Sequence, residues 1–98
     1  MRKPHADPED PARVTRFLAD QGLRHLRARK RGEFVIIESG PEDDPVLHAR
    51  LRRDTVHLWT LEMATHTGRW ERTGFRDQRD KLLDLLVTTF PWIVAARE

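Results

Sequence analysis

The sequence predicts an α+β fold: an N-terminal helix, a five-stranded antiparallel β-meander and a C-terminal amphipathic helix packed on one sheet face. Three observations carry this prediction. Short runs with the two-residue period of strands follow one another through the middle of the chain. Apolar residues with the helical period occur near each end of the chain. A turn at residues 66–68 joins the two clearest strand-like runs.

The hairpin in residues 56–75 fixes the two faces of the expected sheet. Its three-residue turn places Gly68 where the backbone needs a positive φ, which glycine adopts at little cost. Pairing of the two residues that flank the turn puts Trp59 opposite Phe75 in the core. Because successive side chains alternate across a strand, Trp70 then lies on the opposite face.

Three further runs complete the expected meander. They span residues 26–29, 34–37 and 46–53. In the last of them, the core-facing residues are Leu47, Ala49 and Leu51. A turn around Arg31-Gly32 joins the first two runs, and prolines bracket the loop at residues 39–45. A three-residue loop at residues 53–55 sets Leu51 beside His57, and we favour it because a shorter loop would place an arginine beside the core.

The N-terminal helix is predicted from its ends and its apolar stripe. Asp7 is placed to act as N-cap, or the start moves one turn later to Pro11, and Gly22 is placed to end the helix. A helix that continues through Arg29 is the alternative, which Gly22 disfavours. The apolar stripe consists of Val14, Phe17 and Leu18.

The C-terminal helix is expected over residues 81–90, ending before Pro91. Asp77 and Asp80 have the spacing of a capping box at its start. Its core face consists of Leu82, Leu83, Leu86, Val87 and Phe90. We expect residues 92–94 to fold back onto the sheet as a hydrophobic clamp.

Composition indicates a soluble globular protein. The 98 residues predict a single domain with a flexible arm at residues 1–6 and a frayed tail at residues 95–98. Mean hydropathy is −0.70, no apolar run approaches a membrane span, and the N-terminus has no apolar signal region, so we expect a cytoplasmic location. The chain has no cysteine, which excludes disulfides and thiolate chemistry.

Charge alone does not identify a partner. Eighteen basic residues are nearly balanced by sixteen acidic ones. The high isoelectric point of about 9.7 reflects an excess of arginine over lysine, which a GC-rich bacterial genome also produces. The basic residues of 24–31 precede a purely acidic stretch at residues 33–44, and neighbouring strands of opposite charge can pair with each other.

One face of the expected sheet combines arginine, tryptophan and aliphatic side chains. Trp and Arg dominate interaction hot spots, so we predict a binding surface there. Its predicted binding residues are Arg27, Arg29, Phe34, His48, Arg50, Arg52, Leu58, Trp70 and Arg72, together with Ile36, Thr60 and Glu62 on the same face. The alternative is that the first helix covers this face and buries it.

No catalytic or metal-binding constellation is evident in the sequence. The five histidines share no ligand spacing, and Ser39 is the only serine. We therefore predict a chain that is not an enzyme and needs no cofactor or metal. The leading hypothesis is a protein-interaction module, such as a homodimer, an adaptor or an immunity-type partner. Nucleic-acid binding through the same basic and aromatic face is the second hypothesis.

Overall fold

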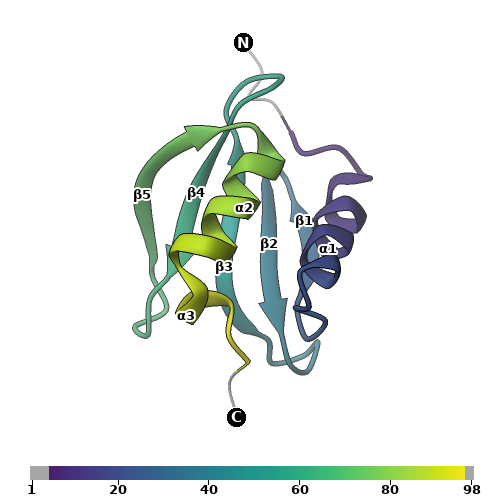
Figure 1. Cartoon of the computed structure of the whole chain (residues 1–98), viewed down its shortest axis with the longest axis vertical. Helices are drawn as coiled ribbons and strands as arrows, with labels where there is room; N and C mark the ends of the chain where they lie inside the picture. Colours follow the sequence, from purple (N-terminus) through teal and green to yellow (C-terminus); the bar gives the residue numbers. More distant parts are fainter. Residues whose placement is uncertain (1–4, 97–98) are drawn as a thin grey trace.

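The computed structural model describes residues 5–96 and has the predicted α+β architecture (Figure 1). A helix, five strands and two further helices follow one another along the chain. Their bounds are α1 Asp10–Asp20, β1 Arg27–Arg31, β2 Phe34–Ser39, β3 Val46–Arg53, β4 Trp59–Ala64, β5 Trp70–Asp77, α2 Arg79–Thr89 and α3 Pro91–Val94. The predicted ends of most elements agree with these bounds to within a few residues.

The strands form one antiparallel sheet in the order β1-β2-β3-β4-β5, so the predicted meander is confirmed. Both α1 and α2 lie on the same side of this sheet (Figure 1). Val14 and Leu18 of α1 belong to the same buried cluster as Leu82 and Leu86 of α2. The alternative in which α1 covers the other face is therefore wrong. The apolar stripes of α1 and α2 therefore both pack on one side of the sheet.

The first helix has Glu9 as its N-cap, two residues after the predicted N-cap Asp7, and begins at Asp10. Pro11 occupies its first turn, where a missing backbone N–H costs no helical hydrogen bond. The carboxylate of Asp10 is 2% exposed and accepts hydrogen bonds from the Asp7 backbone N–H at 2.7 Å and from Arg79 at 2.6 Å. Burial opposes the charged form of Arg79, but its hydrogen bonds to Asp80 and Asp10 outweigh burial and raise the pKa of its guanidinium. The Asp10 carboxylate thus joins the starts of α1 and α2.

The connection between β3 and β4 is longer than predicted. It spans residues 54–58 and is closed by hydrogen bonds to the backbone of Leu58. Leu51 consequently pairs with Leu61, and not with His57. This pairing is displaced by an even number of residues, so the side chains of both strands keep their predicted faces.

A β-bulge in β3 reverses two predicted side-chain directions. Leu47 and His48 together face Glu38 of β2. Leu47 therefore turns away from the helices, whereas His48 turns toward them, is 1% exposed, and donates from Nδ1 to the Ile93 carbonyl at 2.6 Å. The prediction of His48 on the binding face and Leu47 in the core is wrong, because one inserted residue shifts the alternation by one.

A second irregularity displaces the end of β5. The pairing with β4 shifts by two residues around Gly74, whose φ of +82° suits a bulge. Trp59 pairs with Asp77 and is buried in the core, as predicted for its side chain. Phe75 does not lie opposite Trp59; it is 41% exposed and rests beside the Phe90 ring at 6.1 Å between centroids.

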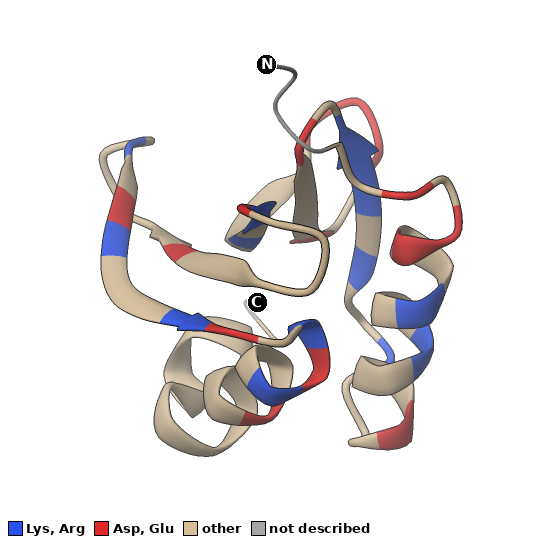
Figure 2. Cartoon of the chain, turned by 90° about the horizontal axis from the view of Figure 1, so that it is seen from above, with Lys and Arg blue, Asp and Glu red and all other residues tan. Residues whose placement is uncertain are grey.

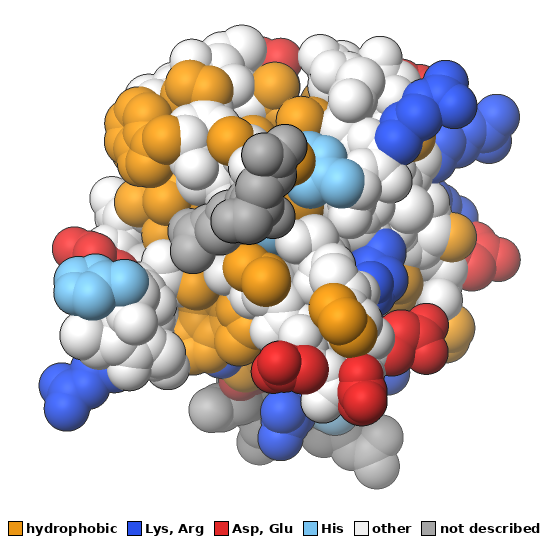
Figure 3. Space-filling view, turned by 90° about the horizontal axis from the view of Figure 1, so that it is seen from below, with side chains coloured by type: hydrophobic (Ala, Val, Ile, Leu, Met, Phe, Trp, Pro, Cys, Tyr) orange, Lys and Arg blue, Asp and Glu red, His pale blue; other side chains and the backbone are white. Residues whose placement is uncertain are grey.

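The core face of the C-terminal helix follows the prediction, whereas its capping box and the complete fold-back of residues 92–94 do not. Leu82, Leu83 and Leu86 of α2 are buried as expected. The capping box is absent, because the Asp77 carboxylate bonds the backbone N–H of its neighbour and no side chain caps the helix. The fold-back is partial, because Val94 is buried whereas Trp92 is 63% exposed. Seen from below, the molecule has hydrophobic side chains gathered on part of its surface (Figure 3).

The expected arm and tail extend beyond the described residues at positions 1–4 and 97–98. Within the described part, Ala6 is 3% exposed and its N–H donates to the Gly32 carbonyl at 3.1 Å, so the chain is held in place from that point. Ala95 and Ala96 are exposed and follow the last helix.

No helix within residues 5–96 has the length and apolar character needed to cross a membrane.

Removal of the Asp10 charge tests the joint between the helices. We expect Asp10→Asn to lower the free energy of unfolding by about 1.5–3 kcal/mol, because two donors to a buried carboxylate are weakened. The matched control is Glu9→Gln, whose carboxylate makes an exposed ion pair with Arg13 and contributes under about 0.5 kcal/mol. Urea unfolding of the three proteins measures both changes, and equal effects would contradict the role assigned to Asp10.

Candidate functional site

The sheet face opposite α1 and α2 is not covered by any helix of the described chain. Seen from above, β1 and β5 stand on opposite sides of this face, and arginine positions occur along both strands (Figure 2). We call this surface the open face. The register and the contacts place on it Arg27, Arg29, Arg31, Phe34, Ile36, Glu38, Leu47, Arg50, Arg52, Thr60, Glu62, Trp70 and Arg72.

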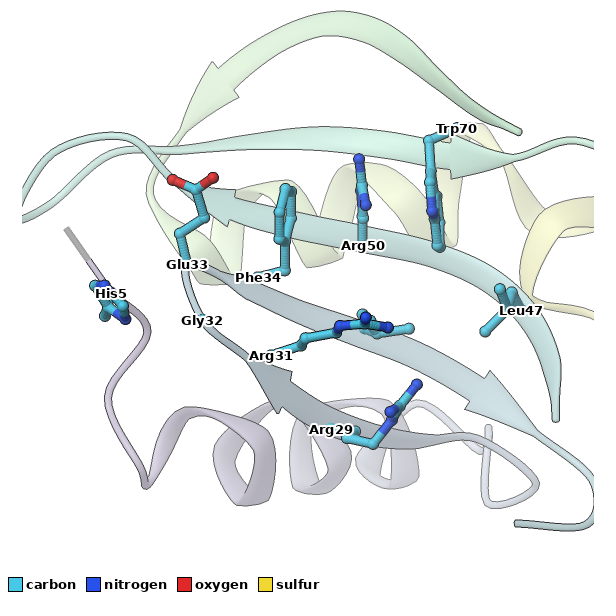
Figure 4. Close-up of a pocket in the computed structure, with 10 residues that line it drawn as sticks. His5, Arg29, Arg31, Gly32, Glu33, Phe34, Leu47, Arg50 and Trp70 are labelled. Carbon is cyan, nitrogen blue, oxygen red and sulfur yellow. The ribbon is translucent and has the colours of Figure 1, made fainter. Parts of the chain in front are cut away.

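Arg50 is held between two aromatic rings at the centre of the open face. Its guanidinium carbon lies 3.9 Å from the centroid of the Phe34 ring and 4.4 Å from that of the Trp70 ring (Figure 4). It also donates to Glu62 on β4 at 2.9 Å. Cation–π contacts and a charge-assisted hydrogen bond together fix a long side chain that would otherwise be mobile.

A buried carboxylate organises the arginines of β1. The Glu38 side chain is 4% exposed and accepts from Arg27 at 2.7 Å and from Arg29 at 2.9 Å. A buried carboxylate needs such partners, because an isolated buried charge is strongly unfavourable. The expected pairing between the basic strand and the acidic stretch thus occurs, but it is confined to Glu38.

Three arginines of the open face keep their charge unbalanced. Arg31, Arg52 and Arg72 form no ion pair with any residue between positions 5 and 96. The Nε atom of Arg52 is buried and has no hydrogen-bond partner in the described part of the chain. Arginines outnumber glutamates on this face, so its surplus charge is positive.

A shallow cavity of about 640 Å³ lies on the open face beside the Arg50 sandwich (Figure 4). Arg29 and Arg31 come from β1, while Arg50 and Trp70 approach from β3 and β5. The aliphatic floor is mostly covered, since Ile36 is only 5% exposed. What this surface offers to a partner is therefore mainly guanidinium groups, together with the partly exposed Phe34, Trp70 and Leu47 side chains.

Most of the predicted binding residues share this face. The structure brings together Arg27, Arg29, Phe34, Arg50, Arg52, Trp70 and Arg72. It removes His48, which the bulge turns inward. Leu58 is half-buried and lies in the loop before β4, outside the paired strands. The placement of the other seven residues on one face agrees with the alternation of strand side chains, whereas the role of these residues in binding stays a prediction.

Sequence reasoning missed three contributors to the open face. The sequence prediction places Arg31 in a turn, although its two-residue spacing from Arg29 is the signal that puts it on the same face. The same prediction includes Glu38 only in an acidic stretch, whereas its side chain is the shared partner of two arginines. Leu47 carried no signal in the sequence, because its direction depends on the bulge.

The buried Ser39–His48 pair has the contacts of a nucleophile and base but not their accessibility. Ser39 Oγ lies 2.7 Å from His48 Nε2, and His48 Nδ1 donates to the Ile93 carbonyl. His25 Nε2 similarly donates to the Val94 carbonyl at 2.7 Å. Because Ser39 is 7% and His48 1% exposed, a substrate has no route to the hydroxyl. The His48 bond to Ile93 fastens α3 to β3, and the His25 bond to Val94 fastens it to the connection between α1 and β1.

Residues 5–96 contain no group of three or more histidine, aspartate or glutamate side chains arranged to hold a metal ion. No protein-family model, curated protein or solved structure matches the chain. The assignment of function therefore rests on the open face itself.

The two sheet tryptophans should differ sharply in their contribution to stability. Trp59 is 5% exposed in the core, so we expect Trp59→Ala to cost about 3–5 kcal/mol. Trp70 is half-buried and stacks on Arg50, so Trp70→Ala should cost about 1–2 kcal/mol. Denaturant unfolding of both variants measures the difference, and an equal loss would mean that Trp70 is a core residue.

Proposed function

We propose that the chain is a cytoplasmic, non-catalytic protein-interaction module that binds its partner through the open face. The observation that carries the proposal is a helix-free sheet surface on which Arg31, Arg52 and Arg72 have no carboxylate partner within the described chain. Guanidinium groups that are not paired inside a protein are available for carboxylates of another.

The rigidity of the surface supports this proposal. Arg50 is already immobilised by Phe34, Trp70 and Glu62 before any partner arrives. Binding then costs less side-chain entropy, since the rotamers at the centre of the face are fixed in the free protein. Tryptophan and arginine packed at the centre of a surface are also the residue types that dominate binding energy in protein interfaces.

The stacking arrangement favours a protein partner over a nucleic acid. Sheet-surface nucleic-acid binders stack bases on aromatic rings. Here one face each of Phe34 and Trp70 is occupied by Arg50, so no base can enter between them. Glu38 and Glu62 cancel part of the positive charge that a phosphate backbone would require.

Site-specific photo-crosslinking in cells tests the proposal. A photoreactive amino acid at position 72 should give crosslinked protein products, whereas the same residue at position 16 on α1 should not. Both positions are exposed, and they lie on opposite sides of the sheet. Adding Arg52→Glu should lower the crosslink yield at position 72 about tenfold, because a like charge then faces the partner's carboxylates.

Two crosslinking results would contradict the proposal. Products of equal yield from positions 72 and 16 would reflect random collisions. The absence of any protein product at position 72 would remove the proposal. Arg16→Glu serves as the charge-matched control, since it reverses one exposed arginine on α1 and should leave the yield unchanged.

Nucleic-acid binding is the second candidate, favoured by the three arginines without carboxylate partners. It predicts binding to single- or double-stranded oligonucleotides that weakens steeply with salt. Arg52→Ala and Arg72→Ala should each reduce the slope of log K against log salt by about one if the guanidinium contacts a phosphate. Fluorescence anisotropy measures the slope, with Arg16→Ala as control, and no binding at low salt would exclude this candidate.

A further inference from the structure

The loop between β2 and β3 is the acidic counterpart of the open face. It begins at Gly40 and carries three consecutive acidic residues, Glu42, Asp43 and Asp44, all exposed. None of these carboxylates forms an ion pair with a residue in the range 5–96. The described chain therefore presents unpaired acids and unpaired arginines on one molecule.

These opposite charges lie at opposite ends of the same strands. Arg31 pairs with Phe34 at the start of β2, and Arg52 pairs with Phe34 from the other side. The acidic loop follows Ser39 at the end of β2. At about 3.3 Å per residue, the five steps from Phe34 to Ser39 cover roughly 17 Å. An ion pair needs about 4 Å, so the loop does not neutralise Arg31 or Arg52 of its own chain.

We infer that the open face binds a second copy of this chain, with the acidic loop of each copy placed over the Arg31 and Arg52 end of the other. The inference rests on the proposed function and names its partner. The two-fold axis lies between the facing sheets, parallel to them and perpendicular to their strands, so it exchanges the two ends of the sheet. One rotation therefore brings the acidic loop of each copy onto the arginine pair of the other. Each contact then occurs twice, as in any isologous dimer.

The dimer is expected to have a low affinity that falls further as the salt concentration rises. A single exposed ion pair contributes little to binding, so the association depends on the doubled set of charges and on burial of the fixed Phe34, Arg50 and Trp70 cluster. Screening shortens the reach of exposed charges as ionic strength rises. We expect dimers at about 0.05 M salt to dissociate at about 0.5 M salt.

Reciprocal charge reversal tests this arrangement. The loop variant carries Glu42→Arg, Asp43→Arg and Asp44→Arg, and the face variant carries Arg31→Glu and Arg52→Glu. Each variant alone sets like charges against each other at both contacts, so each should be monomeric where the unchanged chain is dimeric. A mixture of the two restores both contacts, and light scattering should show heterodimers. Arg16→Glu on α1 is the control that should dimerise normally.

Circular dichroism of the two variants tests whether both are folded. The loop variant should disturb folding less than the face variant, because its three substituted positions are all exposed. A chain that stays monomeric at low salt and high concentration overturns the inference. Reversed variants that dimerise alone, or a mixture that stays monomeric, also overturn it. In either case, crosslinks from position 72 to a different protein would leave the proposed function standing. Such products are distinguished from a self-crosslink by mass, because a self-crosslink has twice the mass of the chain.

Discussion

The packing of both long helices on one side of the sheet is the constraint on which the rest of the molecule depends. Leu18 of α1 and Leu83 of α2 are fully buried in one cluster with sheet residues such as Ile37 and Leu51. Burial of apolar area is the dominant favourable term in folding, and a chain of this size builds one core. Once that core takes every apolar helix stripe, the other sheet face has no cover from within the described chain.

An uncovered sheet face must be made compatible with water by its own side chains. Aliphatic Ile36 is 5% exposed because the long side chains around it cover it. Arginine suits this role, since its hydrocarbon stem covers apolar surface while its guanidinium remains hydrated or paired. Glu38 and Glu62 then fix selected arginines in place. The face is a stable surface of the free protein as well as a candidate for binding.

The parts of the fold that local chemistry determines could be predicted, whereas those set by irregular pairing could not. Gly68 adopts a φ of +81°, and the hairpin closes as its turn requires. The face of Trp70 followed from alternation and survived the longer loop, since an even displacement preserves faces. The face of His48 could not be predicted in this way, because a bulge depends on how β2 and β3 fit together. The residue types and the face of the site were thus predictable outside the bulge, although Arg31 and Glu38 were missed there despite the regular alternation that places them on this face.

The hydrogen bonds of the buried His48 and the half-buried His25 explain why the chain tolerates that bulge. Turning His48 inward removes a titratable group from the open face and supplies a donor to the Ile93 carbonyl, while His25 supplies one to Val94. Carbonyls near the end of a short helix lack helical partners and need such donors when they are buried. The same inserted residue turns Leu47 outward beside Trp70. One local irregularity therefore fastens the C-terminal segment and completes the aromatic end of the open face, which couples the stability of α3 to the shape of the proposed binding surface.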